Sequence, residues 1–226
     1  MKKNYAVALD GPSGAGKSTL AKAIAQELNI TYVDTGAIYR VIGLKAYRSG
    51  IGIQNAADVI PLLSGLEIGL RHGADGVQHM LLNGEDVTEE IRLPEISLYA
   101  GAVSALPEVR AFLLEMQRKY AREQSVIMDG RDIGTVVLPN ADVKIFLTAD
   151  AEIRAKRRFL ELEQRGTPRP YEEVLSDLNQ RDYNDIHRKT APLVCAEDAV
   201  RVDTSSLDFH QSKEVILAII REKTGQ

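Results

Sequence analysis

Short, continuous apolar runs alternate with longer amphipathic segments along most of the chain. The clearest runs are Tyr5–Leu9, Ser125–Met128 and Val143–Thr148, and each has the length and apolar continuity of a strand buried in a parallel sheet. Ile30–Asp34 and Ala199–Val202 predict two further strands. Because helical segments separate the strands, the pattern predicts an α/β fold, with a parallel five-stranded sheet and helices on both of its faces.

Amphipathic spacing between the strands predicts the helices. They are expected over Lys17–Leu28, Ala37–Arg48, Asn55–Leu66, Glu95–Leu106, Glu108–Glu123, Ala151–Arg165, Tyr171–Lys189 and Gln211–Lys223. Pro107 separates the fourth helix from the fifth, and the breaker run 166–170 separates the sixth from the seventh. The sixth and seventh segments therefore predict a helical hairpin.

Between residues 66 and 92 the pattern changes to that of short strands. Leu66–Arg71 and Val77–Leu82 predict two strands around a turn at Gly73–Gly76. Asn83 and Gly84 predict a second tight turn, because this dipeptide favours the left-handed backbone that hairpins need. We therefore expect a small antiparallel β insert here, not another strand-helix-strand unit.

The composition narrows the class of ligand. The chain has 226 residues, of which 44% are hydrophobic and 27% charged, and this is enough for one α/β domain with an insertion and a core of its own. The net charge of −4 argues against a nucleic-acid partner. Arginine nevertheless outnumbers lysine by 17 to 11, and arginines cluster late in the chain. Guanidinium groups match phosphate oxygens bidentately, so small phosphorylated ligands are expected.

The number of cysteines and the hydropathy of the chain indicate the cellular compartment. Cys195 is the only cysteine, which excludes an intrachain disulfide and favours a reducing compartment. The apolar run within Met1–Leu9 is too short for a signal peptide, and no apolar stretch approaches the ~18 residues of a membrane span. We expect a cytoplasmic monomer with no membrane partner.

A phosphate-binding motif follows the first predicted strand and opens the first helix. It comprises Gly11, Pro12, Ser13, Gly14, Ala15, Gly16, Lys17 and Ser18, with Thr19 next in the chain. The pattern G-x-x-x-x-G-K-[ST] in this context predicts a loop whose backbone N–H groups cradle phosphate oxygens. Lys17 is expected to reach the β- and γ-phosphates of a nucleoside triphosphate, and Ser18 to ligate Mg²⁺.

The motif alone predicts only that a nucleoside triphosphate binds. A G-protein would need a guanine-reading Asn-Lys-x-Asp string, which the sequence lacks, and the chain is too short for the extra elements of a helicase motor. A more specific prediction of function therefore requires the residues that follow the other predicted strands.

Two further strands end in polar strings. Tyr39 and Arg40 follow the second strand, where open α/β sheets bind ligands, and Arg40 is a candidate for an acceptor phosphate. Asp129 ends the Ser125–Met128 strand at the place where P-loop enzymes carry a magnesium-linked carboxylate. Arg131 and Asp132 come next in a glycine-flanked loop and have the pattern of a binding pair.

A third polar group lies on the predicted hairpin. It consists of Arg154, Arg157 and Arg158 on one helix, and Arg181, Asp185 and Arg188 on the other. In each set the spacing places the side chains on one helix face, within about 60° in the second set, so the hairpin is expected to close over phosphates. The ladder Asp177–Arg181–Asp185 also fits surface ion pairs that merely stabilise a helix.

Taken in chain order, these strings resemble the bacterial cytidylate kinases. The matching strings are Asp10–Thr19, Asp34–Arg40, Leu82–Thr88 with Ile91-Arg92, Asp129–Thr135, and Arg181-Asp182 with Asp185, Arg188 and Ala191–Leu193. The strings extend from residue 10 to residue 193, so the resemblance covers nearly the whole chain. The phosphate loop is common to many families, whereas the insert string and the Gly-Arg-Asp-x-Gly-Thr string are much narrower.

The resemblance implies a P-loop nucleoside-triphosphate hydrolase-like fold and a reaction. The core would be residues 1–34 and 94–226 with a helical lid at about 154–170, and residues 35–93 would form a nucleoside monophosphate-binding region with a small β-sheet at about 62–93. The implied reaction moves the γ-phosphoryl of ATP to CMP or dCMP, with Mg²⁺ as cofactor, in pyrimidine nucleotide metabolism.

The resemblance also implies the roles of individual residues. Those expected to bind the acceptor nucleotide are Thr35, Tyr39, Arg40, Arg110, Arg131, Asp132, Arg181, Asp185 and Arg188. Arg110 and Asp132 would read the cytosine edge, whose exocyclic amine donates where uracil has an acceptor. Arg154 and Arg158 would cover ATP together with Gly11–Thr19. The catalytic set would be Lys17, Arg131, Arg188 and Arg157, and the metal set Ser18 and Asp129.

One position departs from the family pattern. Nine residues before Arg110 the family has a base-contacting serine, and this chain has Gly101, with Ser97 and Ser104 one helical turn to either side. This departure bears on discrimination between CMP and UMP. Apart from it, a P-loop kinase for UMP, AMP or a small metabolite is the alternative within the same class, and a nucleotide-binding module without phosphoryl transfer is the alternative from a different class.

Overall fold

The computed structural model describes residues 4–73 and 78–225. The first residues of the chain, residues 74–77 and Gln226 are left undescribed, so Val77 and most of the turn expected at Gly73–Gly76 lie outside the described residues. The remaining elements can be compared with the sequence pattern one by one.

The chain divides into two compact units, which are described separately. The first unit runs to Thr31 and resumes at Gln124, and the second is Tyr32–Glu123. The division differs from the expected one after residue 93, since residues 94–123 fall in the second unit. The physical reason is that the helix beginning at Pro94 packs closely on the helix Thr35–Arg48.

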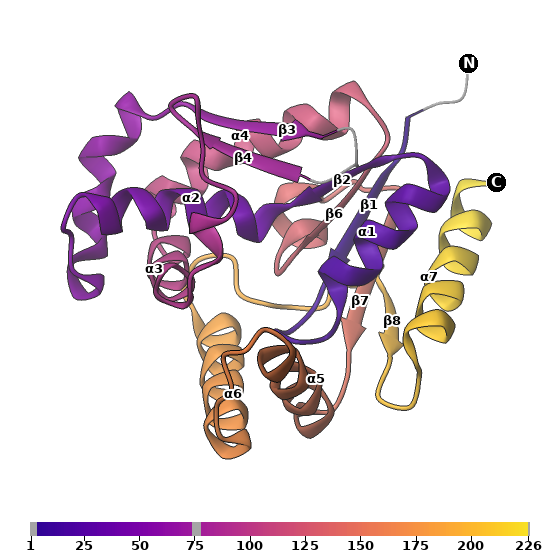
Figure 1. Cartoon of the computed structure of the whole chain (residues 1–226). Coiled ribbons are helices and arrows are strands. Elements are labelled where there is room, and N and C mark those ends of the chain that lie inside the picture. The colour runs from indigo at the N-terminus through magenta and orange to yellow at the C-terminus, as the bar shows by residue number, and fades with distance from the viewer. Residues whose placement is uncertain (1–3, 74–77, 226) are drawn as a thin grey trace. The chain divides into compact units, whose positions relative to one another are not determined.

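A five-stranded parallel sheet confirms the predicted α/β class. Its strands are β1 (Ala6–Asp10), β2 (Thr31–Asp34), β6 (Val126–Gly130), β7 (Val143–Thr148) and β8 (Val200–Asp203), in the order β2-β6-β1-β7-β8 (Figure 1). Val7, Ala8 and Leu9 of β1 and the three apolar residues of β6 are buried, as continuous apolar runs require. The register pairs Leu9 with Asp129 and Asp10 with Gly130, so the loops that leave β1 and β6 start at one edge of the sheet.

The described part of the first unit also contains four α-helices. They are α1 (Lys17–Leu28), α5 (Ala151–Gln164), α6 (Tyr171–His187) and α7 (Phe209–Thr224). Figure 1 shows α1 and α7 side by side along the sheet, and they bury Ile24 and Ile220. Helices α5 and α6 pack against each other and confirm the predicted hairpin. None of the helices in the described part of the chain is long and apolar enough to cross a membrane, and the monomeric state stays a prediction.

In its described residues the second unit has three α-helices and two 3₁₀ segments. The α-helices are α2 (Thr35–Arg48), α3 (Pro94–Ser104) and α4 (Pro107–Glu123), and the 3₁₀ segments are η1 (Ile53–Gly65) and η2 (Glu90–Arg92). A Cβ on Gly43 of α2 would lie 2.8 Å from the backbone nitrogen of Ala100, so glycine permits the close approach of α2 and α3. The α-helix expected near Asn55–Leu66 is instead the 3₁₀ segment, which contains Pro61, a residue without a backbone N–H.

The predicted antiparallel insert is confirmed within the second unit. Its strands are β3 (Ile68–His72), β4 (Gln78–Leu82) and β5 (Glu85–Asp86). Asn83 and Gly84 both have positive φ, as the hairpin turn between β4 and β5 requires. The guanidinium group of Arg48 donates to the carboxylates of Glu85 and Glu90 and so ties the insert to α2.

Candidate active site

The phosphate loop connects β1 to α1. Gly11 has φ of +148°, and a Cβ there would lie 2.0 Å from the carbonyl oxygen of Leu147 on β7, so only glycine fits. The loop ends at Gly16, the N-cap of α1, which has no side chain to bond the first amides of the helix. Free helical N–H groups and the positive end of the helix dipole make this a natural place for an anion.

Lys17 is the buried cation of this loop. Its side chain is 5% exposed, and its Nζ donates to the carbonyl oxygen of Pro12 at 2.7 Å. Burial lowers the pKa of Lys17 well below its usual value, and the charge of Arg131 lowers it further, against the opposing effect of Asp129. A phosphate beside this ammonium group would stabilise its charged form.

Ser18 and Asp129 lie together at the start of α1. The Ser18 hydroxyl donates to Asp129 Oδ2 at 2.7 Å, and Asp129 is 5% exposed. A hydroxyl and a carboxylate are oxygen ligands of the kind that Mg²⁺ takes. No group of three or more His, Cys, Asp or Glu side chains suited to a metal occurs among the described residues. The Ser18 hydroxyl and the Asp129 carboxylate fit a magnesium ion, which would supply positive charge beside bound phosphates.

Asp10 joins the phosphate loop to the loop after β6. Its two carboxylate oxygens accept hydrogen bonds from the backbone N–H groups of Ile133 at 2.8 Å and Gly134 at 2.7 Å. These residues begin a short π-helical segment, η3 (Ile133–Val137), in which the N–H of Val137 bonds the carbonyl of Asp132. Burial raises the pKa of Asp10 to about 6, although both backbone hydrogen bonds oppose the rise.

A cluster of two arginines and two aspartates forms next to this loop. Arg131 Nε donates to Asp185 Oδ2 at 2.8 Å, and Arg188 Nη1 lies 3.7 Å from Asp185 Oδ1. Arg188 Nη2 also donates to Asp132 Oδ1 at 3.2 Å. The structure thus brings together four of the residues expected to bind the acceptor. We call Arg131, Asp132, Asp185 and Arg188 the arginine cluster.

The electrostatics of the arginine cluster favour an anion. Burial alone would raise the pKa of Asp185, but the charges of Arg131, Arg181 and Arg188 outweigh burial and hold the pKa below its usual value. Asp185 therefore stays ionised and fixes the guanidinium groups near one another. Two guanidinium groups held in this way offer a phosphate a ready set of charge-assisted hydrogen bonds.

The three arginines expected to cover ATP lie in three different environments. Arg158 is exposed and pairs with Glu161 on its own helix. Arg157 donates to the carbonyl oxygen of Thr204 at 2.7 Å, and burial lowers its pKa. Arg154 is buried and bonds the Ser13 carbonyl. Helical spacing predicts a shared face but not these separate partners.

Thr35, Tyr39, Arg40 and Arg110 all belong to the second unit. The Arg110 guanidinium lies 5.4 Å from the centroid of the Tyr39 ring and donates to the Ser104 carbonyl at 3.1 Å. Thr35 is buried and Arg40 half-buried on α2. The structure thus brings Tyr39 and Arg110 together, as two members of one binding surface require.

Gly101 lies on α3, where a serine would fit. A Cβ built on Gly101 would meet nothing within 4 Å, so no steric reason requires glycine. The Ser104 hydroxyl donates to the Gly101 carbonyl at 2.9 Å and is thus engaged by its own helix. Gly101 therefore leaves open space where the family pattern has a serine side chain.

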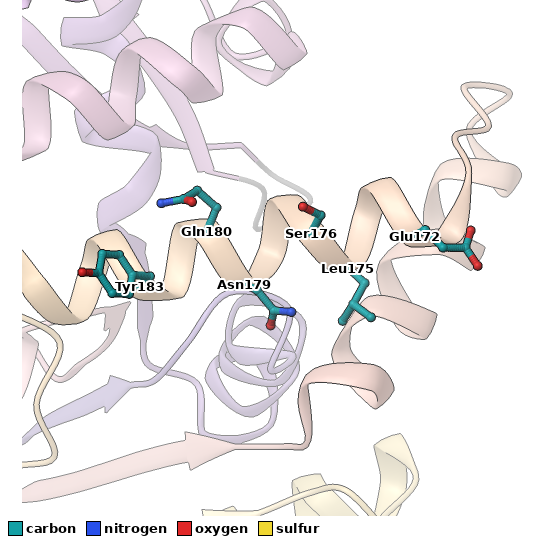
Figure 2. A pocket seen from close by; sticks show the side chains of 6 residues that line it. All are labelled: Glu172, Leu175, Ser176, Asn179, Gln180 and Tyr183. Atoms are coloured by element: carbon teal, nitrogen blue, oxygen red, sulfur yellow. The ribbon is translucent and has the colours of Figure 1, made fainter.

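A surface hollow on α6 is a different feature. It is lined by Glu172, Leu175, Ser176, Asn179, Gln180 and Tyr183, which all come from that one helix (Figure 2). It includes none of the residues that the sequence places in the site, and its only charged lining side chain is a carboxylate. The hollow therefore does not suit a phosphate.

Two site residues escaped sequence reasoning. Asp10 and Asp182 stand inside the strings that carry the family resemblance, but the sequence pattern predicts no role for either residue. The signal that was available for Asp10 is its position between an apolar strand and a glycine, where a carboxylate needs a nearby partner. Asp182 follows Arg181 directly, and its significance depends on contacts with the phosphate loop that no local pattern contains.

The fold and the site together define a nucleotide kinase of the P-loop class. The family model described as cytidylate kinase matches residues 7–222. The chain is 48% identical to the cytidylate kinase of Caldicellulosiruptor bescii, with 96% of each chain covered, and 47% identical to that of Desulfitobacterium hafniense, with 99% of this chain and 95% of the relative covered. The chain belongs to the cytidylate kinase family.

A solved structure supports the fold alone. An uncharacterized protein from Eubacterium ventriosum superposes with a TM-score of 0.52 at 14% identity, with 97% of this chain and 99% of that chain covered.

Proposed function

We propose that this protein transfers the γ-phosphoryl group of ATP to CMP or dCMP, giving ADP and CDP or dCDP. The observation that carries the proposal is the geometry around Asp10, which directly precedes the phosphate loop and accepts hydrogen bonds from the backbone N–H groups of Ile133 and Gly134, just after Arg131 and Asp132 in the chain. The phosphate loop and the arginine cluster are thus neighbours in the fold. Such an arrangement suits two phosphorylated ligands that meet end to end.

The chemistry needs alignment and charge neutralisation more than proton transfer. A phosphate monoester has a second pKa near 6, so at pH 7 the acceptor is already largely dianionic and needs no general base. Lys17 would hold the phosphates of ATP, while Arg131 and Arg188 would hold the acceptor phosphate. These fixed cations would offset the charge that spreads over the transferred group in the transition state.

Ser18 and Asp129 are the residues that would hold Mg²⁺, Ser18 directly and Asp129 as its carboxylate neighbour. The ion would add positive charge at the β- and γ-phosphate oxygens. The chain supplies the rest through the loop amides, Lys17 and the arginines.

Recognition of cytosine is assigned to Asp132 and Arg110. The exocyclic amine of cytosine donates hydrogen bonds where uracil has an acceptor, so a carboxylate favours cytosine. Asp132 is 4% exposed, and Arg188 bonds one of its oxygens. With uracil in place of cytosine, the buried Asp132 carboxylate would lose the amine that donates to it. Leaving a buried carboxylate unsatisfied costs free energy, and this is the physical basis for rejecting uracil.

UMP is the second acceptor that an observation favours. The space beside Gly101 holds no side chain within 4 Å of a Cβ position, so one contact expected for the base is absent. Discrimination between CMP and UMP would then depend on Asp132 and Arg110 alone.

An ADP-release assay with CMP, dCMP, UMP and AMP at equal concentrations tests the proposal. We expect kcat/KM to be highest for CMP or dCMP, with UMP behind and AMP last. A higher value for AMP, or for UMP, would refute the assignment of the acceptor. ATP binding with no ADP formed from any acceptor would point instead to a nucleotide-binding module.

A further inference from the structure

The crest of the phosphate loop rests on the hairpin of α5 and α6. Gly14, with φ of +74°, packs so closely that a Cβ there would lie 3.2 Å from both Arg154 Cβ and Leu178 Cδ1. Arg154 comes from α5, and Leu178 comes from α6, one helical turn before Asp182. Both helices of the hairpin therefore contact the loop at one place.

Hydrogen bonds reinforce this packing at Ser13. The Ser13 backbone N–H donates to Asp182 Oδ1 at 3.2 Å, and the Ser13 carbonyl accepts from Arg154 Nη1 at 2.9 Å. Arg154 Nη1 also donates to Asp182 Oδ2 at 2.6 Å. Arg154, Asp182 and the Ser13 peptide groups thus form a closed ring of contacts.

This ring of contacts is buried, and a further hydrogen bond holds its arginine to the backbone. The side chains of Arg154 and Asp182 are 8% and 13% exposed, and Arg154 Nε donates to the Ala149 carbonyl at 2.7 Å, just before α5 begins. A buried ion pair whose members also bond the backbone is held in one geometry, because breaking any contact leaves a polar group unsatisfied.

We propose that Arg154 and Asp182 are positioning residues that seat the phosphate loop on the hairpin and so set its shape for the phosphates of ATP. This inference rests on the proposed function only in taking ATP as the loop's ligand. Arg154 then acts through Ser13 and Gly14 and does not cover ATP directly. The hairpin is anchored at Arg154, so any lid movement belongs to the exposed end around residues 165–170.

Binding measurements on Asp182→Asn test the proposal. The amide keeps the shape but offers only one acceptor oxygen, so it cannot serve both Ser13 and the Arg154 guanidinium. We expect the Kd for ATP, measured by calorimetry without acceptor, to rise roughly tenfold, and the Kd for CMP to stay within twofold. Asp177→Asn is the matched control, because Asp177 lies on the same helix in an exposed pair with Arg169, and neither Kd should change.

Two results would overturn the proposal: an unchanged Kd for ATP, or equal weakening of ATP and CMP, which would show general displacement of α6. If wild-type protein fails to bind CMP, the proposed function fails while the ATP measurement still tests the ring. Hydrogen exchange on the wild-type protein needs no variant at all. The Ser13 amide should be protected without ligand, and exchange at the rate of an unprotected amide would refute the ring even if Asp182→Asn does not fold.

Discussion

The phosphate loop and the arginine cluster both have the donors and the positive charge that suit phosphate, but one is built from backbone and the other from side chains. The loop uses backbone N–H groups, and its shape depends on Gly11, where even a methyl group would overlap the Leu147 carbonyl. The arginine cluster uses side chains, and its shape depends on Asp185 and Asp132 holding two guanidinium groups. A site built from backbone fails when a substituent is added, whereas a site built from side chains fails when a charge is removed.

The largest expected effect concerns Lys17, the buried cationic side chain of the loop. Lys17→Met should lower kcat by about 10²-fold or more, because it removes a fixed cation from the transition state. The thermal midpoint should stay level or rise, because burial already lowers the pKa of Lys17 and its charged form is therefore unfavourable in the folded protein.

Steady-state kinetics and a thermal melt on the same sample measure both effects. Lys22→Met, on the same helix, is the control and should keep the wild-type kcat. A near-normal kcat for Lys17→Met would remove the loop from the mechanism.

Asp10 links the two regions, and its titration offers the next largest effect. Its pKa is about 6 in the folded protein against 3.8 for the free residue, so the folded state binds more protons between these values. The stability contributed by this carboxyl is therefore fully present below pH 3.8 and is lost as the pH rises through about 6. The loss amounts to roughly 2–3 kcal/mol.

Urea unfolding of the wild-type protein and Asp10→Asn from pH 4 to 8 tests this sign. The free energy of unfolding of the wild type, minus that of the variant, should fall between pH 4 and about 6 and then level off. A difference that rises with pH over this range would mean that Asp10 is stabilised as a carboxylate.

A substitution of Asp132 tests whether the arginine cluster acts in acceptor binding separately from ATP binding. Asp132→Ala should raise KM for CMP by roughly 10- to 30-fold while KM for ATP stays within about threefold, because the lost carboxylate is assigned to the acceptor base and its partner Arg188 to the acceptor phosphate. Asp132→Asn keeps the shape and separates loss of charge from loss of volume. Equal rises in both KM values would show that Asp132 supports the whole site and does not read the base.

The same contrast explains what the sequence could predict. The phosphate loop is a continuous string between a strand and a helix, so its residues and their roles follow from local pattern. The arginine cluster requires Arg131 to meet Asp185, 54 residues away, and Arg188 to meet Asp132, 56 residues away. Spacing predicts which residues share a helix face, but it does not contain the partner that the face meets.

Arg154 and η3 show the limit most clearly. Helical spacing groups Arg154 with Arg157 and Arg158, yet Arg154 bonds Ser13, 141 residues earlier in the chain. The start of η3 is bonded by Asp10, which accepts the N–H groups of Ile133 and Gly134 across 123 and 124 residues. The family resemblance predicts which residues belong to the arginine cluster. The contacts that hold those residues in place can be read only from the fold.

Gly101 gives the smallest expected effect and the sharpest contrast with Gly11. Gly11 belongs to the phosphate loop, where a Cβ would overlap backbone, whereas Gly101 stands where the family has a serine, and a Cβ there meets nothing within 4 Å. Gly101→Ser should therefore fold normally, with a gain of a few tenths of a kcal/mol from helix propensity. If the family's base contact is restored, the ratio of kcat/KM for CMP to that for UMP should rise about two- to fivefold.

Gly101→Ala separates the hydroxyl from the helix effect, since it should stabilise α3 equally well or better and leave the CMP-to-UMP ratio unchanged. An equal rise in the ratio for both variants would assign the effect to the stiffness of α3 and not to a contact with the base. No rise in either would mean that Asp132 and Arg110 already provide the whole discrimination, and that the empty space beside Gly101 is neutral for recognition.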